Sequence, residues 1–203
     1  MMKKNFKAGT MLNPVPAVMV SLGEGEKANI ITIAWTGIIN SDPPMTYISV
    51  RPERHSYGLL KESGEFVINL TTEDLAKATD FCGVKSGRDI DKWQATGLTK
   101  EGCQIVKCPQ IKESPLSLEC KVVECKALGS HDMFIAEIVA VNVDENLIDE
   151  EGKIWLDKAH PLAYLHGEYF GLKKYPIGKF GFSVMKAKTK KRVNKETNNR
   201  YRG

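Results

Sequence analysis

The sequence has no long hydrophobic run, and this absence excludes a membrane-spanning helix. No apolar stretch approaches the roughly 18 residues that a helix needs to cross a bilayer. The N-terminal segment also lacks the features of a secretion signal: Asn13, Pro14 and Pro16 interrupt its apolar part, and residues 23–26 put Gly-Glu-Gly-Glu where small residues would precede cleavage. We therefore expect a cytoplasmic protein without membrane contact.

Common catalytic and nucleotide-binding signatures are missing as well. The chain contains no G-x-G-x-x-G and no P-loop, which argues against a Rossmann-type nucleotide site. Neither G-x-S-x-G nor H-E-x-x-H occurs. Two of the four histidines, His160 and His166, are six residues apart, which is not a spacing that puts two metal ligands on one face of a helix. The sequence therefore predicts no standard hydrolase site and no histidine-based metal site.

The chain has only five cysteines, an odd number that is ordinary for a reduced compartment. Cys103 and Cys108 lie five residues apart, as do Cys120 and Cys125, and paired cysteines can bind zinc or an iron–sulfur cluster. Residues 118–125, however, have the pattern of a strand, on which residues five apart point to opposite faces. We favour buried or half-buried free thiols over a metal site.

Charge is distributed unevenly along the chain. The 203 residues carry a formal net charge of +4, and residues 186–203 hold eight Lys or Arg against the single acid Glu196. That tail alone carries +7, which leaves −3 for the rest of the chain. We predict a folded domain over residues 1–185 and a basic, flexible tail over 186–203. A tail of this kind is more often solvated than bound to nucleic acid, which we keep as the alternative.

The hydrophobic pattern is mainly that of strands. Runs of strands with few helices indicate a barrel or sandwich rather than a parallel α/β sheet. The expected strands are 15–22, 30–39 (bent at Gly37), 45–50, 65–70, 117–125 and 133–143. Short helices are expected over 55–61, over 72–81 with Thr72 as its cap and Gly83 as its stop, and as a turn over 159–165.

The most informative stretch is residues 49–56, which contains two arginines, a histidine and two serines between a strand and a helix start. Helix N-termini present free N–H groups, and Arg side chains match phosphate oxygens. The stretch therefore suits a bound phosphate, and the alternative is a solvated strand end beside a capped helix.

Three other segments could contribute to a ligand site. Trp35 ends an apolar strand beside small residues and could form a slot for a planar ring, or it is a core residue. Lys92, in the polar loop 86–93, is either a solvated charge or an anion contact. His131, in the turn 129–132, either caps the turn or reaches over a ligand.

Taken together and in this order, these segments resemble the flavin reductase-like family, over about residues 10 to 180. Within it, the pattern is most similar to the flavoredoxins, small FMN electron-transfer proteins. The resemblance implies a mainly β fold, an FMN-binding split β-barrel with a few short helices, which would occupy residues 1–185. It also implies a homodimer with FMN near the interface.

The resemblance assigns cofactor contacts and no catalytic residue, because the flavin itself carries the chemistry. It places Asn29, Thr32, Trp35 and Thr36 along the isoalloxazine ring, and Ser49, Arg51, Arg54 and Ser56 along the phosphate and ribityl chain. It further implies that Ser86, Lys92 and His131 reach the flavin, and that Tyr164 adds an aromatic contact, across the dimer interface. One departure is Ser130, which stands where the family usually has Asp before the histidine.

Three functions remain open on this basis. A flavoredoxin-like electron carrier would keep FMN bound and pass electrons to a redox protein partner. An NAD(P)H-dependent flavin reductase would supply reduced flavin to a partner. A flavin-binding module would have no enzymatic role. We favour the first.

Overall fold

The computed structural model describes residues 1–173, 175–186 and 189. The chain divides into two units, Met1–Gly171 and Leu172–Gly203. In the second unit the described residues include the short 3-10 helix η4 (Phe182–Val184). Of the predicted basic tail, only Lys186 and Thr189 lie within the described residues. The boundary at residue 185 and the flexibility of the tail therefore stay predictions.

The first unit consists of strands with a few short helices. The strands are β1 (Val18–Leu22), β2 (Asn29–Ile33), β3 (Thr36–Ser41), β4 (Pro44–Val50), β5 (Glu65–Asn69), β6 (Lys100–Glu101), β7 (Gln110–Ile111), β8 (Leu116–Ala127), β9 (Asp132–Val143), β10 (Leu162–Leu165) and β11 (Glu168–Gly171). The helices are α1 (His55–Ser63), α2 (Ala76–Val84) and α3 (Lys92–Thr96), with 3-10 turns η1 (Gly25–Lys27), η2 (Glu145–Leu147) and η3 (Leu156–Ala159).

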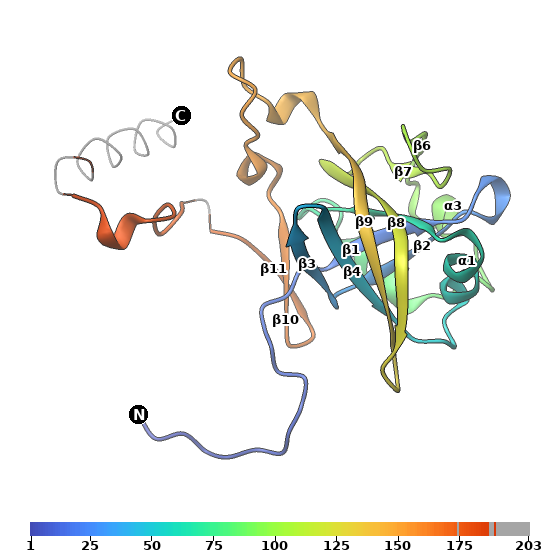
Figure 1. Ribbon diagram of the computed structural model, residues 1–203, viewed down its shortest axis with the longest axis horizontal. Helices are drawn as coiled ribbons and strands as arrows, with labels where there is room; N and C mark the ends of the chain where they lie inside the picture. The colour runs from blue at the N-terminus through green and yellow to red at the C-terminus, as the bar shows by residue number, and fades with distance from the viewer. Residues whose placement is uncertain (174, 187–188, 190–203) are drawn as a thin grey trace. The chain divides into compact units, whose positions relative to one another are not determined.

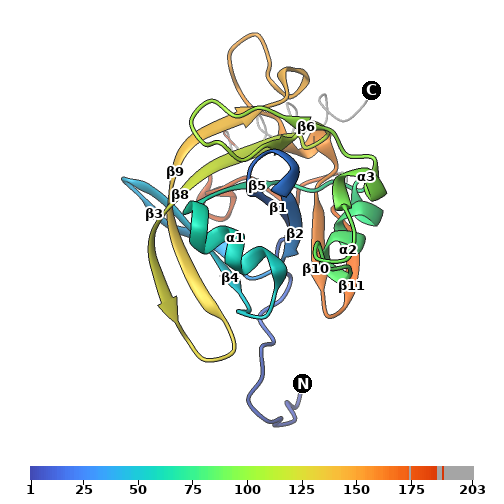
Figure 2. The same cartoon turned by 90° about the vertical axis from the view of Figure 1, so that its right-hand side faces the viewer.

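Seven strands form one antiparallel sheet in the order β2-β1-β5-β8-β9-β4-β3 (Figure 1). The sheet curls so that β2, at one end of the order, approaches β4 near the other end (Figure 2). The N–H of Ser49 donates to the carbonyl oxygen of Trp35 at 3.0 Å, which extends the β3–β4 pairing by one residue, whereas no ladder between β2 and β4 is found in the described part of the chain. The barrel is closed by packing but split between two strands, which confirms the predicted fold class.

Two apolar layers hold β1 and β2 between them. Inside the barrel, Phe66, Phe134 and Ile48 pack with Leu60 of α1, which lies across the opening of the curved sheet in Figure 2. On the outer side, Met19 and Ile30 pack against Cys82 of α2 and Trp93 of α3. Burial on both faces explains why these two strands read as continuous apolar runs. Each such side chain contributes about 1.5–3 kcal/mol through the hydrophobic effect.

The predicted single strand over 30–39 is wrong, because the structure breaks it into β2 and β3 at Ala34 and Trp35. β2 pairs with β1, whereas β3 pairs with β4. The chain must leave one ladder before it joins the other, so the break falls at the split of the barrel and not at Gly37.

Two helix predictions are corrected by tertiary packing. α2 begins at Ala76 rather than at residue 72, and a turn precedes it in which the Thr72 hydroxyl accepts from the N–H of Leu75, as a capping residue does. Gly83 lies inside α2, where a Cβ would stand 3.3 Å from the Cβ of Thr32. The predicted helical turn over 159–165 is mostly strand β10, because it pairs with β11.

The five cysteines are free thiols, three buried and two partly buried, as predicted. Cys120 and Cys125, however, pack against the same core and do not point to opposite faces. A β-bulge between Val122 and Glu124 shifts the alternation by one residue. Among the described residues no group of three or more His, Cys, Asp or Glu is arranged to hold a metal ion. No helix in that part of the chain is long and apolar enough to cross a bilayer.

Candidate flavin-binding groove

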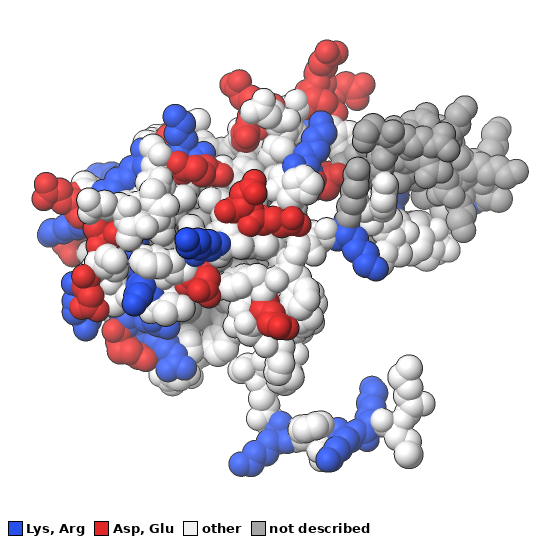
Figure 3. Space-filling view, turned by 180° about the vertical axis from the view of Figure 1, so that it is seen from behind, with Lys and Arg blue, Asp and Glu red and all other residues white. Residues whose placement is uncertain are grey.

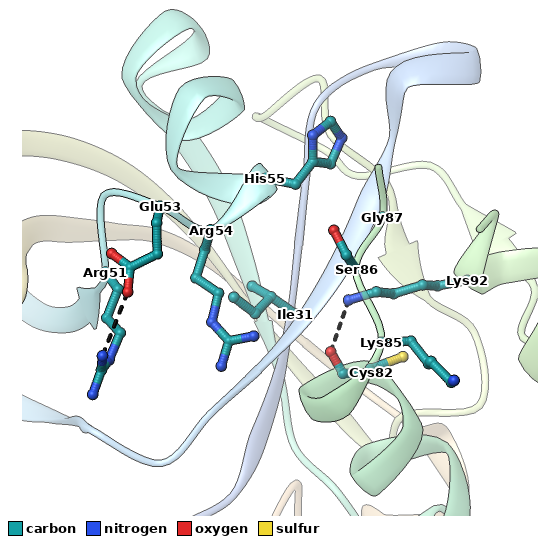
Figure 4. A pocket seen from close by; sticks show the side chains of 10 residues that line it. All are labelled: Ile31, Arg51, Glu53, Arg54, His55, Cys82, Lys85, Ser86, Gly87 and Lys92. Carbon is teal, nitrogen blue, oxygen red and sulfur yellow. Dashed lines mark hydrogen bonds and ion pairs between the residues drawn. The ribbon is translucent and has the colours of Figure 1, made fainter. Parts of the chain in front are cut away.

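A cavity of about 350 Å³ opens beside the split of the barrel, where the start of α1 faces the end of α2 (Figure 4). It is lined by Ile31, Arg51, Glu53, Arg54, His55, Cys82, Lys85, Ser86, Gly87 and Lys92. β2 supplies its floor, the β4–α1 connection one wall, and the end of α2 with the following loop the other wall.

A smaller cavity of about 180 Å³ continues the first along the seam between β2 and β4. The two cavities share Ile31, Arg51 and Arg54, so they form one groove. The smaller part is lined by Ile31, Thr32, Ile33, Ala34, Trp35, Ser49, Val50, Arg51, Arg54 and His131. The larger end is mostly polar, and the smaller end carries the aromatic groups.

Cations dominate the larger end. Arg51, Arg54, Lys85 and Lys92 line it, against the single carboxylate Glu53 among its lining residues. In Figure 4 the Arg54 guanidinium and the Lys92 ammonium point into the same space over Ile31. Arg54 is also the N-cap of α1, whose first turn presents backbone N–H groups. This end is therefore built to bind an anion.

Lys92 is nearly buried, with 3% of its surface exposed. Its Nζ donates to the carbonyl oxygens of Ile30 at 2.7 Å and Cys82 at 2.8 Å. Burial lowers the pKa of Lys92 to about 8, with the Cys82 thiol opposing and Arg54 adding to the shift. The residue before it, Asp91, caps α3 by accepting from the N–H of Trp93. This cap fixes the helix start that carries Lys92.

Asn29 and Ser56 meet beneath the floor of the groove rather than on its surface. The Asn29 amide donates to the Ser56 hydroxyl at 2.9 Å, and both residues are buried. Gly87 lies directly on this pair, since a Cβ there would stand 2.3 Å from Asn29 Oδ1. The contact holds the loop that carries Ser86 against β2.

Trp35 and His131 form the aromatic end of the groove. Their ring centroids are 4.4 Å apart, although Trp35 follows β2 and His131 belongs to the turn between β8 and β9. The Ser130 hydroxyl lies 3.0 Å from His131 Nδ1. Burial, together with the charges of Arg51 and Arg54, lowers the pKa of His131 while Glu53 opposes. This shift favours the neutral imidazole at pH 7.

Eight of the twelve residues predicted as cofactor contacts line the groove. They are Thr32, Trp35, Ser49, Arg51, Arg54, Ser86, Lys92 and His131. The other four do not line it. Asn29 and Ser56 form the buried pair described above, and the Thr36 hydroxyl donates to the carbonyl oxygen of Tyr47. Tyr164 lies on β10, with its ring 5.3 Å from that of Tyr169. Whether any of the twelve contacts a cofactor stays a prediction.

Several lining residues escaped the sequence reasoning. Glu53 and His55 lie within the stretch 49–56, and Lys85 and Gly87 flank Ser86, so proximity in the sequence could have indicated them. Ile31 lies between Asn29 and Thr32, so the predicted contacts beside it could also have indicated it. Cys82 gave no such signal. It reaches the groove because α2 packs on β2, which no local pattern reveals.

Comparison with known proteins matches this arrangement to a family. The family model of the flavin reductase like domain matches residues 10–173. The chain belongs to the flavin reductase-like family. The resemblance found in the sequence is thereby confirmed.

Solved structures of the family superpose over nearly the whole chain. Flavoredoxin of Desulfovibrio vulgaris (Miyazaki F) is 29% identical with a TM-score of 0.81, covering 90% of this chain and all of that one. Flavoredoxin from Methanosarcina acetivorans is 28% identical with a TM-score of 0.80, and the match covers 91% of this chain and 100% of that one. Among curated sequences, an uncharacterized protein of Pyrococcus abyssi is 29% identical over 68% of this chain and 80% of its own length.

Proposed function

We propose that this flavin reductase-like protein binds FMN in the groove and acts as an electron carrier of the flavoredoxin type. The observation that carries the proposal is the groove itself, with four cations at one end and the Trp35–His131 pair at the other. FMN has a matching shape, because its negatively charged phosphate lies at the end of the ribityl chain and its planar aromatic ring lies at the other end.

The residues present fit such a ligand. The larger cavity alone falls within the 300–1,000 Å³ range usual for small-molecule sites. Arg51, Arg54, Lys85, Ser86 and the first turn of α1 would hold the phosphate. Trp35 and His131, with Thr32 and Ser49, would hold the ring end. Gly87 supports the fit, since its missing Cβ lets the loop approach the floor closely.

Bound FMN would supply electron or hydride transfer, which needs no acid–base residue of the protein. The protein's own part is to hold the ligand, exclude water and set the local charge. Lys92 places a buried positive charge beside the groove, and a cation there favours a more negative ligand. We therefore expect Lys92 to raise the reduction potential of the bound flavin.

We further propose a homodimer as the working assembly. Tyr164 does not line the groove of its own chain, so it would meet a flavin only across an interface between two copies. Light scattering coupled to size exclusion tests this point: a mass of one chain would remove Tyr164 from the site.

The second candidate is an NAD(P)H-dependent flavin reductase. The exposure of the ring end to solvent favours it, because Trp35 there is 42% exposed and a reductant could reach a flavin beside it. Retention of FMN and the rate of its reduction by NAD(P)H separate the two functions.

A non-enzymatic flavin-binding module, or a role of the basic tail in binding nucleic acid, is the weakest candidate. Figure 3 shows Lys and Arg interspersed with Asp and Glu on the face it presents, and not a continuous basic field. Binding that weakens with salt and is lost on deletion of residues 186–203 would support that role.

The test of the proposed function is the absorption spectrum of the purified protein, followed by identification of the flavin released on heating. A yellow protein that releases FMN and bleaches slowly with NAD(P)H supports the carrier. Rapid bleaching supports the reductase. A colourless protein that also fails to bind added FMN would contradict the flavin assignment.

A further inference from the structure

The cationic end of the groove contains one carboxylate, and its position is unusual for an anion site. Glu53 is the only acid among the ten residues that line the larger cavity. Its Oε1 lies 3.4 Å from Nη1 of Arg51 (Figure 4). A bound phosphate would share this space with a negative charge that belongs to the protein.

Glu53 is coupled to both arginines of the seam. A hydrogen bond with its own backbone lowers the pKa of Glu53 and burial opposes it, while the hydrogen bond to Arg51 and the charges of Arg51 and Arg54 lower the pKa further. The carboxylate is therefore ionised at neutral pH. Arg51 and Arg54 are also the two cations that both parts of the groove share.

The ion pair is weak enough to be exchanged for a ligand. The side chains of Arg51 and Glu53 are 51% and 65% exposed, and exposed ion pairs contribute little to stability. A carboxylate has no proton to donate to a phosphate at neutral pH, so it can only repel it. An incoming phosphate dianion must displace Glu53 from Arg51 or accept its repulsion.

We propose that Glu53 is an internal counter-anion that competes with the phosphate of a bound flavin for Arg51 and Arg54, and so limits the affinity for phosphate-bearing flavins. The inference rests on the proposed function and deepens it. The residue sets whether FMN is held tightly, as a carrier requires, or exchanges with free flavin. Riboflavin, which lacks the phosphate, would not experience the competition.

The test compares Glu53→Gln with the unchanged protein for FMN and riboflavin. Protein saturated with either flavin is diluted serially, and the fluorescence of free flavin gives the dissociation constant. We expect the dissociation constant for FMN to fall by roughly two- to five-fold, the range for one exposed charge pair. The constant for riboflavin should stay the same, and the FMN effect should shrink at high salt.

Glu62→Gln is the matched control. Glu62 is an exposed residue of α1 outside both cavities, and the substitution changes the net charge by the same amount. Tighter FMN binding in Glu53→Gln alone supports the inference.

Unchanged FMN binding in Glu53→Gln would overturn it, as would equal tightening for both flavins. Weaker FMN binding would overturn it too, since Glu53 would then orient Arg51 for the phosphate. If the unchanged protein binds neither flavin, the proposed function fails, and the inference fails with it.

Discussion

Lys92 donates a hydrogen bond from its ammonium to the carbonyl oxygen of Cys82 at 2.8 Å. The bond joins the start of α3 to α2, and a second one, to Ile30, joins α3 to β2. The same ammonium lines the groove. Lys92 thus holds the wall of the site together and places positive charge in it.

Replacing Lys92 with Met should lower both stability and flavin affinity. The substitution keeps the length of the side chain but leaves two buried carbonyl oxygens without this donor, at a cost of about 2 kcal/mol or more. Denaturant unfolding and FMN titration measure the two effects. Lys61→Met is the control, because Lys61 is exposed and lies outside both cavities. Unchanged affinity and potential in Lys92→Met would remove Lys92 from the site.

The pH dependence of stability should report the burial of Lys92. Its pKa is lowered to about 8 in the folded protein from an unfolded value of about 10.4. Between these values the unfolded chain binds a proton that the folded chain does not, so the contribution of Lys92 to stability rises with pH. The difference in unfolding free energy between the unchanged protein and Lys92→Met should therefore increase from pH 8 to pH 10. If this difference in unfolding free energy does not change with pH, the pKa of Lys92 in the folded protein has its ordinary value.

Trp35→Ala should weaken FMN retention with little effect on the fold. Trp35 is 42% exposed and contacts His131 at the aromatic end of the groove, so its removal should cost less than about 1 kcal/mol of stability. Flavin content after gel filtration measures retention, with Trp35→Phe as the conservative control. Full flavin occupancy in Trp35→Ala would show that the indole is not a cofactor contact.

Gly87→Ala should disturb the groove through its floor. The new Cβ would stand 2.3 Å from Asn29 Oδ1, and the hydrogen bond to buried Ser56 restrains Asn29 from moving away. We expect a loss of about 1–3 kcal/mol in stability and weaker FMN binding. Gly102→Ala is the control, since no atom lies within 4 Å of a Cβ there and its backbone is outside the left-handed region. Normal FMN binding by Gly87→Ala would mean that the loop can shift without cost.

A buried carboxylate away from the groove should control acid stability. Glu119 is fully buried and accepts from Asn142 Nδ2 at 2.8 Å and from the backbone N–H groups of residues 104, 105 and 106. Burial raises its pKa, but these hydrogen bonds outweigh burial and hold the pKa below its ordinary value. The stability that Glu119 contributes is present above the unfolded pKa of about 4.3 and is lost as the pH falls through the folded pKa.

Glu119→Gln should therefore destabilise the protein by about 2–4 kcal/mol at pH 7, since its amide N–H₂ faces N–H donors. It should also flatten the acid limb of the stability curve. Glu124→Gln, an exposed change on the same strand, should do neither. Equal acid sensitivity of the two variants would show that Glu119 is not the group that titrates.

Local sequence determined much of the fold and one half of the site. Alternating and apolar runs located β1, β4, β5, β8 and β9 because side-chain burial repeats with the period of a strand. The stretch 49–56 predicted the cationic wall, since its residues are adjacent in the chain. The order of the motifs along the chain was enough to indicate the family.

Tertiary structure decided what depends on contacts between distant segments. The break at Ala34 and Trp35 follows from the exchange of partners at the split, and β10 exists because β11 pairs with it. The predicted anion contact Lys92 is also a tie between α3, α2 and β2, because its hydrogen bonds go to carbonyls 62 and 10 residues away. Every residue has a backbone carbonyl, so the sequence does not show which carbonyls will accept from Lys92. Only the folded chain brings Lys92, Ile31 and Cys82 to one groove.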